Sequence, residues 1–189
     1  MASDVDICNS ALNSVGASNI ISLTEDSKAG RICNQRFVPV RNMVMRAHPW
    51  NCLIRRAELA QDSTGPIFEY AYSYQLPSDP YCLRVLEVEN QADGIDYVIE
   101  GRKLLTDEGG IKLKYLAMVT DPNEYDSGLL EAISSCLAAE IAFSLSNSSA
   151  LQAQLYQLYE RKLSEARFQD ATEGTPDQIT ARTFTDARR

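Results

Sequence analysis

The stretch Ala47-His48-Pro49-Trp50-Asn51-Cys52 contains the only histidine and the only tryptophan of the chain, two positions apart. It lies between a segment with helical spacing of apolar residues and a region with strand-like alternation. A tryptophan at such a place usually anchors one structural layer on another, because its ring buries a large apolar surface and its N–H needs an acceptor nearby. We therefore interpret His48, Pro49 and Trp50 as a structural junction of the fold.

Two helices are predicted before this junction. Residues 4–15 carry apolar side chains at helical spacing, a serine or an aspartate at their start can cap the helix, and Gly16 stands where a C-terminal cap belongs. A second helix is predicted over residues 26–44. Pro39 lies inside it and predicts a kink or an early break, because proline lacks the N–H that the helix interior needs.

After the junction, between Cys52 and Met118, the periodicity becomes typical of strands. The predicted strands are residues 67–76, 82–88, 96–100, 103–105 and 111–116. Gly101-Arg102 and Gly109-Gly110 predict tight turns, because glycine supplies the positive φ that such turns require. These glycines do not have the spacing of a phosphate-binding loop. We therefore expect a small antiparallel sheet and no nucleotide-binding motif.

Helical spacing returns after Asp121-Pro122. An apolar stripe with many alanines, residues 129–145, predicts a core helix, and residues 151–166 predict a long amphipathic helix after a serine-rich break. Helices from both ends of the sequence should therefore pack together. The predicted fold class is α+β, with a discontinuous helical bundle of residues 1–51 and 122–170, an inserted β domain of residues 52–121, and an extended C-terminal tail of residues 171–189.

The predicted tail is polar and carries too little apolar surface to fold alone. Its large apolar residues and its last arginines are Ile179, Phe184, Arg182, Arg188 and Arg189. A basic extension with two apolar anchors can dock on a partner. A frayed terminus is the alternative interpretation of the same composition.

The composition excludes several classes of protein. A net charge of −8 over 189 residues argues against a protein that grips nucleic-acid phosphates, which requires clustered lysine and arginine. The five cysteines are scattered without a CxxC pair and are expected to be small buried hydrophobes in a reducing compartment. We predict no metal site, because one histidine and unpaired cysteines cannot complete a usual zinc ligand set. With no signal sequence and no stretch approaching about 18 apolar residues, we expect a soluble chain outside the membrane.

Candidate catalytic groups are few. His48 is the obvious base, but no serine or cysteine stands in a nucleophile motif, so a packed structural histidine is favoured. Glu87 and Glu89 would share one face of a strand, either as a solvated face or as an acid–base pair. Neither arrangement by itself predicts a reaction.

Three tyrosines, Tyr70, Tyr72 and Tyr74, alternate along one predicted strand and should line a single face. Such a face could be a platform for a sugar or a base, although it more often packs against helices or a neighbouring subunit. The sequence thus predicts no catalytic residue and no cofactor. It favours a structural or interaction protein over an enzyme.

Four segments together resemble one known family. They are residues 7–23 of the first helix and its loop, His48-Pro49-Trp50-Asn51, residues 74–85 from Tyr74 to Val85, and residues 158–167 of the late helix. Their order and spacing resemble the head-to-tail adaptor of short-tailed bacteriophages, the tail tubular protein A or gatekeeper family. Two departures are Cys52, where similar sequences often carry an aromatic residue, and the inserted Pro80-Tyr81.

The resemblance implies a structural virion protein and no enzyme. It would form a ring, commonly of twelve copies, between the portal and the rest of the tail, as part of the DNA ejection conduit. Its partners would be the portal ring, neighbouring copies and the next tail component, a nozzle or tube, and DNA would pass through the lumen without sequence-specific binding. The C-terminal tail would reach onto the portal, and the protein would be assembled in the host cytoplasm.

An acidic chain suits such a conduit, because a negatively charged lumen does not bind passing DNA. Two alternatives remain open from the residues. One is a tail component with glycan hydrolase activity, which would use a carboxylate pair beside the tyrosines. The other is a non-viral interaction module.

Overall fold

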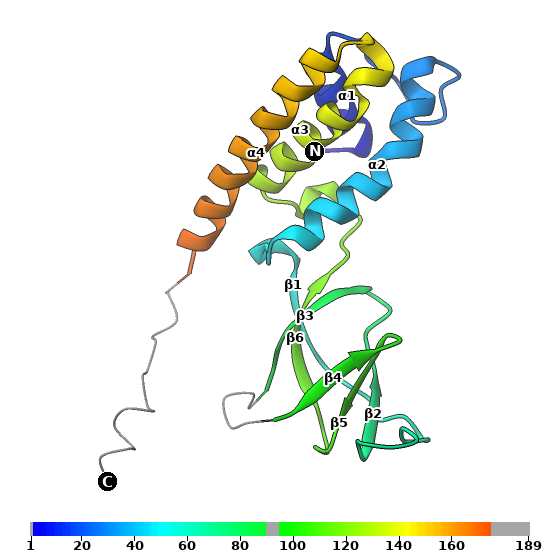
Figure 1. The fold of residues 1–189 in the computed structure, drawn as a ribbon, viewed down its shortest axis with the longest axis vertical. Coiled ribbons are helices and arrows are strands. Elements are labelled where there is room, and N and C mark those ends of the chain that lie inside the picture. The colour runs from blue at the N-terminus through cyan, green and yellow to red at the C-terminus, as the bar shows by residue number, and fades with distance from the viewer. Residues whose placement is uncertain (1, 90–94, 175–189) are drawn as a thin grey trace.

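The computed structural model describes residues 2–89 and 95–174 (Figure 1). Within these residues the fold is α+β, with four α-helices and two antiparallel sheets of three strands each. The helices come from both ends of the sequence and gather at one end of the molecule, while the strands lie at the other. The predicted fold class is therefore confirmed. The predicted extended tail lies outside the described residues, except for its first four residues.

Helix α1, Asp4–Val15, is bounded by local signals. Ser3 accepts a hydrogen bond from the Asp6 N–H at 3.1 Å, and the Asp6 carboxylate accepts one from the Ser3 N–H at 3.0 Å, which completes a capping box. At the other end Gly16 adopts a φ of 77°, the left-handed conformation that closes a helix. Both ends of α1 agree with the sequence prediction.

Helix α2, Lys28–Ala47, begins after Ser27, which caps the N–H of Gly30 at 3.0 Å. It is continuous through Pro39, so the expectation of an early break there is wrong. A proline removes one donor from the ladder, but buried residues on both sides of it, among them Phe37 and Val40, pack into the core and hold the helix together.

Helix α3, Ser127–Ser146, is the centre of the helical part. It packs against α1, α2 and α4, and eleven of its residues are buried. It is also apolar enough to cross a membrane by length and composition, with a mean hydropathy of 1.5 over 18 residues, so the expectation that no stretch approaches such a span is wrong. Of that window, 61% is buried inside the protein, which is the behaviour of a core helix.

Helix α4, Ser149–Thr172, returns along α3 and extends beyond it toward the strands (Figure 1). Asn147 closes α3 in the left-handed conformation, and Ser148 caps α4 by accepting from the Leu151 N–H at 3.2 Å. Two short 3-10 turns, η1 at Asn51–Leu53 and η3 at Pro122–Glu124, lie where the chain passes between helices and strands.

The strands form two sheets, where a single sheet was predicted. Sheet A has the order β1-β6-β3 and sheet B the order β2-β5-β4, and every pairing in both is antiparallel. The strands are β1 Ile54–Glu58, β2 Tyr72–Gln75, β3 Cys82–Val88, β4 Tyr97–Glu100, β5 Lys103–Thr106 and β6 Lys112–Ala117. The sequence prediction missed β1, because its IRRAE sequence does not alternate in polarity.

In sheet B, the hairpin between β4 and β5 agrees with the sequence prediction, whereas β2 does not. The turn between β4 and β5 is the expected hairpin, with φ of 51° at Gly101 and 65° at Arg102. The predicted strand over residues 67–76 is much shorter, because Glu69 has a φ of 71°, which an extended strand cannot contain. Consequently Tyr70 lies outside β2, and the predicted stripe of three tyrosines on one strand is wrong.

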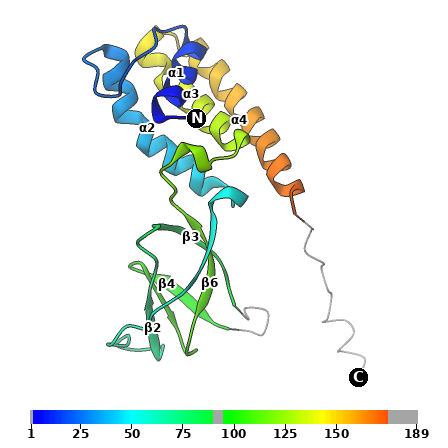
Figure 2. The ribbon, with the colours of Figure 1, turned by 180° about the vertical axis from the view of Figure 1, so that it is seen from behind.

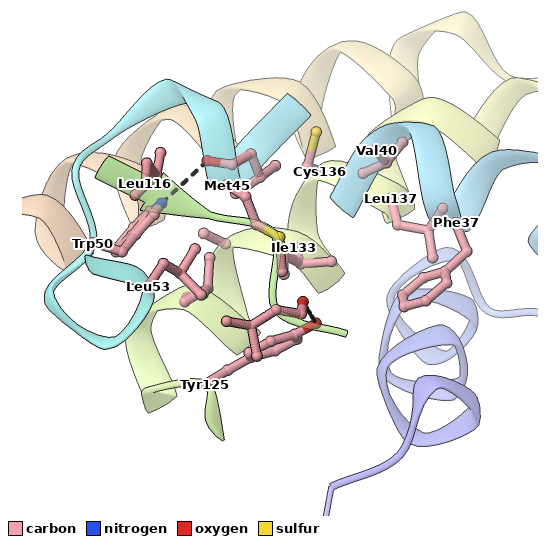
Figure 3. Close-up of a cluster of buried hydrophobic side chains, with 14 of the residues drawn as sticks. Phe37, Val40, Met45, Trp50, Leu53, Leu116, Tyr125, Ile133, Cys136 and Leu137 are labelled. Carbon is pink, nitrogen blue, oxygen red and sulfur yellow. Dashed lines mark hydrogen bonds between the residues drawn. The ribbon is translucent and has the colours of Figure 1, made fainter. Parts of the chain in front are cut away.

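One hydrophobic core joins the helical part to sheet A. Figure 3 shows Trp50, Leu53 and Leu116 beside Ile133 of α3, all of them fully buried. Because the strands share this core with the helices, the inserted region is anchored on the bundle by packing as well as by its two chain connections.

The cysteines are part of this core. Cys8, Cys33, Cys82 and Cys136 are buried, and only Cys52 is half-buried. Burial raises the pKa of the Cys136 thiol to about 11. The interpretation of the cysteines as small hydrophobes fits four of the five positions.

This burial predicts an order of thiol reactivity. Because the thiolate is the reacting form and needs access to the reagent, a maleimide near neutral pH should label Cys52 first and Cys136 only as the protein unfolds. Mass spectrometry of the labelled sites over time measures the order, and the Cys52→Ser variant should lack the fast phase. Urea-unfolded protein, in which all five should react at similar rates, is the control. Rapid labelling of Cys136 in the native protein would contradict the packing described here.

Candidate functional site

The predicted junction begins where α2 ends. His48 is the first residue beyond α2 and is extended, with φ −142°, as expected before a proline, which disfavours helical geometry in the preceding residue. The last carbonyls of a helix lack partners within it. Two of them find partners elsewhere: the Trp50 indole N–H donates to the Val44 carbonyl at 3.1 Å, and Arg167 of α4 donates to the Ala47 carbonyl at 3.3 Å.

Trp50 is fully buried and packs with the apolar residues of α3 and β6 (Figure 3). The His48 ring meets its edge at 4.9 Å between ring centroids, with the two planes at 76°. The ring of Trp50 therefore fixes the direction in which the chain leaves α2 for the strands, as a tryptophan with both an apolar body and a satisfied N–H can do.

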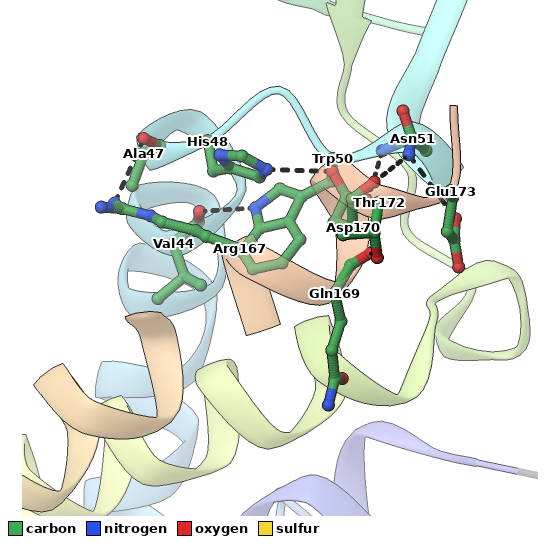
Figure 4. A network of polar contacts seen from close by, with 10 residues as sticks. All are labelled: Val44, Ala47, His48, Trp50, Asn51, Arg167, Gln169, Asp170, Thr172 and Glu173. Carbon is green, nitrogen blue, oxygen red and sulfur yellow. Dashed lines mark hydrogen bonds and ion pairs between the residues drawn. The ribbon is translucent and has the colours of Figure 1, made fainter. Parts of the chain in front are cut away.

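A polar contact on the other side of His48 ties down the end of α4. His48 Nε2 lies 2.9 Å from Asp170 Oδ2, and the other carboxylate oxygen, Oδ1, accepts from the Asn51 N–H at 2.9 Å (Figure 4). The Asn51 side chain donates to the Asp170 backbone carbonyl at 2.7 Å. We call this contact of His48 and Asn51 with Asp170 the α4 clasp.

The acid of the clasp is buried, although Asn51 is exposed. The Asp170 side chain is 4% exposed and that of His48 is 17% exposed. Both oxygens of a buried carboxylate are therefore satisfied by donors from a single short segment, residues 48–51, more than a hundred positions earlier in the chain. Seen from behind in Figure 2, α4 ends beside the point where the chain enters the strands. The clasp thus sets where α4 stops relative to the β region.

Sequence reasoning found His48 and Trp50 but missed Asp170. A signal existed, because the buried residues of α4, Leu155, Tyr159, Ala166 and Asp170, follow each other at steps of four, seven and four. An aspartate at an apolar position of a helical stripe must find a partner when it is buried. A buried aspartate at that position requires a hydrogen-bond donor from another part of the chain, which is the signal that could have identified Asp170.

The predicted boundary of the tail also changes. Ala171 and Thr172 continue α4, so the helix extends two residues past the boundary at residue 170. The proposed docking residues Ile179, Arg182, Phe184, Arg188 and Arg189 lie outside the described residues. An open groove of about 440 Å³ lies at the clasp, lined among others by Pro49, Asp170 and Gly174.

The candidate carboxylate pair lies elsewhere, on sheet A. Glu87 faces Lys114 at 3.8 Å and Glu89 faces Lys112 at 3.2 Å, so each acid is paired with a lysine of β6. They line an open groove of about 430 Å³ together with Arg56, and no tyrosine lines it. The arrangement is a solvated face of paired charges.

Tyr72 and Tyr74 lie in sheet B and Tyr70 just before it, and they do not form an open platform. Tyr74 is 1% exposed, and its hydroxyl donates to the Glu108 carbonyl at 2.9 Å and accepts from the Gly110 N–H at 2.9 Å. It therefore stabilises the Gly109-Gly110 turn from inside the fold. The structure does not bring Glu87 and Glu89 together with Tyr70, Tyr72 and Tyr74 as a sugar site would need.

Among residues 2–89 and 95–174 no group of three histidine, cysteine or acidic side chains could hold a metal ion. The polar atoms of the junction hold one segment of the chain to another through hydrogen bonds, so the arrangement supports a structural role. No protein-family model matches this sequence, and no curated protein matches it.

Proposed function

We propose that the chain is a structural virion protein, the head-to-tail adaptor that forms a ring of about twelve copies between the portal and the rest of the tail. The observation that carries the proposal is the α4 clasp. The junction His48–Asn51 and residues 158–167 of α4 are two of the segments that resemble the adaptor family. The clasp joins the junction to α4 three residues beyond the second segment, at Asp170, and Arg167, the last residue of that segment, donates to Ala47 just before the junction. Two regions of the chain that separately resemble one family are thus held next to each other.

The first of the resembling segments supports the same proposal. The Asn9 side chain accepts from the Ile20 N–H at 2.8 Å and donates to the Ile20 carbonyl at 2.9 Å. This reciprocal pair fastens the loop after α1 to the helix itself. The residues that carry the resemblance here are again those that hold the backbone in place, which is what a shared fold requires.

The clasp also gives the proposal a physical sense. A segment that docks on a partner binds more tightly when its point of departure is fixed, because less freedom is lost on binding. Asp170 fixes the end of α4 only a few residues before residues 175–189, which include the proposed portal-docking side chains. The net charge of −8 agrees with a conduit that does not bind passing DNA.

Native mass spectrometry of the full chain, alone and mixed with the cognate portal ring, tests the proposal. We expect saturation at one copy per portal subunit. A chain that ends at Gly174 keeps the clasp and should remain folded by circular dichroism, but it should no longer bind the portal. Failure of the full chain to bind would overturn the adaptor role and favour a non-viral interaction module. A truncated chain that still decorates portals would refute the role of the tail.

A further inference from the structure

A groove between α2 and the β region concentrates positive charge on this acidic protein. It has a volume of about 790 Å³ and contains three arginines, Arg46, Arg84 and Arg102. Within the described part of the chain no carboxylate lines it. Its apolar residues include Tyr81 and Ile99, which are 39% and 44% exposed. We call it the arginine groove.

Two of these arginines are held in place by backbone carbonyls. Arg46 donates to the Leu83 carbonyl, and Arg102 donates to the Pro77 carbonyl at 2.8 Å while its guanidinium lies 3.7 Å from the centre of the Tyr81 ring. None of the three forms an ion pair with an acid among the described residues. Positioned guanidinium groups without a counter-charge are suited to bind a carboxylate from outside.

The end of sheet B away from the arginine groove carries exposed apolar side chains together with carboxylates. Ile67 and Phe68, in the loop that precedes β2, are 99% and 72% exposed, and Glu69 follows them. The pKa of Tyr70 is raised by desolvation and then by the carboxylates of Asp96, Glu69 and Asp107, which gather at this end. We call Ile67, Phe68 and Glu69 the acidic tip.

Contacts place these acids at the start of β2. The Asp107 carboxylate accepts from the Ala71 N–H at 2.8 Å, and the Asp96 carbonyl accepts from the Thr106 hydroxyl at 2.8 Å. Thr106 pairs with Tyr72, the first residue of β2. At the other end of the same strands, Gln75 pairs with Lys103, next to Arg102 of the arginine groove.

The tip and the groove therefore lie at opposite ends of sheet B, separated by the length of its strands, about 13 Å for four residues. One copy cannot insert its own tip into its own groove. We propose that the acidic tip of one copy docks in the arginine groove of the next. This inference rests on the proposed ring, for which it supplies the contact between neighbours.

The chemistry of both surfaces favours a second copy over nucleic acid. Duplex DNA would use the arginines and leave the exposed Tyr81 and Ile99 without partners. A tip with two large apolar side chains and a carboxylate uses both, and aromatic and arginine residues are the types that dominate protein interfaces. A contact between two different surfaces repeats head to tail and closes into a ring when its rotation permits.

Sedimentation velocity of the full chain over a concentration series tests the contact with two variants. Phe68→Ser weakens the tip and Arg84→Glu repels it from the groove, and neither side chain is needed for the core. The wild type should self-associate with increasing concentration, and each variant should need a concentration about tenfold or more higher to reach the same average mass. Phe168→Ser, at the same 72% exposure, and Arg161→Glu are matched controls on α4 that should behave as wild type.

Mixing the two variants distinguishes a head-to-tail contact from other modes. The intact tip of the Arg84→Glu copy can enter the intact groove of the Phe68→Ser copy. The groove of the Arg84→Glu copy and the tip of the Phe68→Ser copy are both defective, so such a pair cannot bind a third copy. We therefore expect pairs that do not grow further. A wild type that stays monomeric, variants that associate as wild type does, or a mixture without pairs would each overturn the proposal.

Two further outcomes separate this inference from its alternatives. In the first outcome, a duplex oligonucleotide binds the wild type and Phe68→Ser but not Arg84→Glu, and Phe68→Ser self-associates as the wild type does. This result would assign the groove to nucleic acid and overturn the contact. Saturation of the portal by both variants as by the wild type would overturn the contact and leave the adaptor role intact. If the chain self-associates in the expected pattern but does not bind the portal, the contact would be supported and the adaptor role would be refuted.

Discussion

Replacing Trp50 by alanine should lower the free energy of unfolding by about 3–5 kcal/mol. The ring is fully buried among Leu53, Leu116 and Ile133, so its removal leaves a cavity between the helices and sheet A. It also leaves the Val44 carbonyl without its 3.1 Å donor at the end of α2. Because a whole domain is stable by only about 5–15 kcal/mol, we expect a protein that is marginally folded or unfolded.

Urea denaturation followed by circular dichroism measures this loss. Trp50→Phe keeps a six-membered ring but loses the N–H and part of the buried volume, so it should be destabilised clearly less than Trp50→Ala. Phe168→Leu, which changes an aromatic residue that is 72% exposed, is the control and should lie within about 0.5 kcal/mol of wild type. A Trp50→Ala protein as stable as that control would show that the junction does not hold the two parts together.

Replacing Asp170 by alanine should cost about 2–4 kcal/mol and should loosen the end of α4 specifically. The substitution removes the acceptor of both the Asn51 N–H and the His48 ring nitrogen, and it leaves the half-buried His48 nitrogen without its partner in the protein. Asp170→Asn keeps one oxygen that can accept from Asn51, so its effect should be smaller. The loss is expected to concentrate in the last turns of α4, because the rest of the helix packs on α3.

Hydrogen exchange measured by mass spectrometry, together with urea denaturation, separates these effects. Amides in the last two turns of α4 should exchange faster in Asp170→Ala, while those of α3 should change little. Glu173→Ala is a matched control in the same segment, because Glu173 is exposed and makes only a long, weak contact of 3.5 Å with the Asn51 side chain. Equal exchange in Asp170→Ala and Glu173→Ala would contradict the role given to the clasp.

If the clasp also fixes the departure of the tail that we propose to dock on the portal, Asp170→Ala should weaken portal binding even where the protein remains folded. The tail side chains themselves are unchanged in this variant, so the loss would come from the added freedom of the segment that carries them. The same native mass spectrometry used for the full chain would detect it as incomplete occupancy of the portal ring.

The helices were predictable because their signals are local. The capping box of Ser3 and Asp6 and the left-handed Gly16 lie within one helical turn of the ends that they define. The strand boundaries were less predictable. Glu69 interrupts the predicted strand before the alternating tyrosines, so β2 begins only at Tyr72, and β1 has no alternation in polarity.

By itself, the sequence determined the α+β class, the helices at both ends, the hairpin at Gly101-Arg102 and the importance of the His48–Trp50 junction. Only the tertiary structure decided that the strands divide into two sheets, that Asp170 is the partner of His48, and that the acidic tip and the arginine groove lie at opposite ends of sheet B. The physical reason is the range of the interactions involved. Caps and turns are fixed by residues a few positions apart, whereas the pairing of residues 122 positions apart depends on how the whole chain packs.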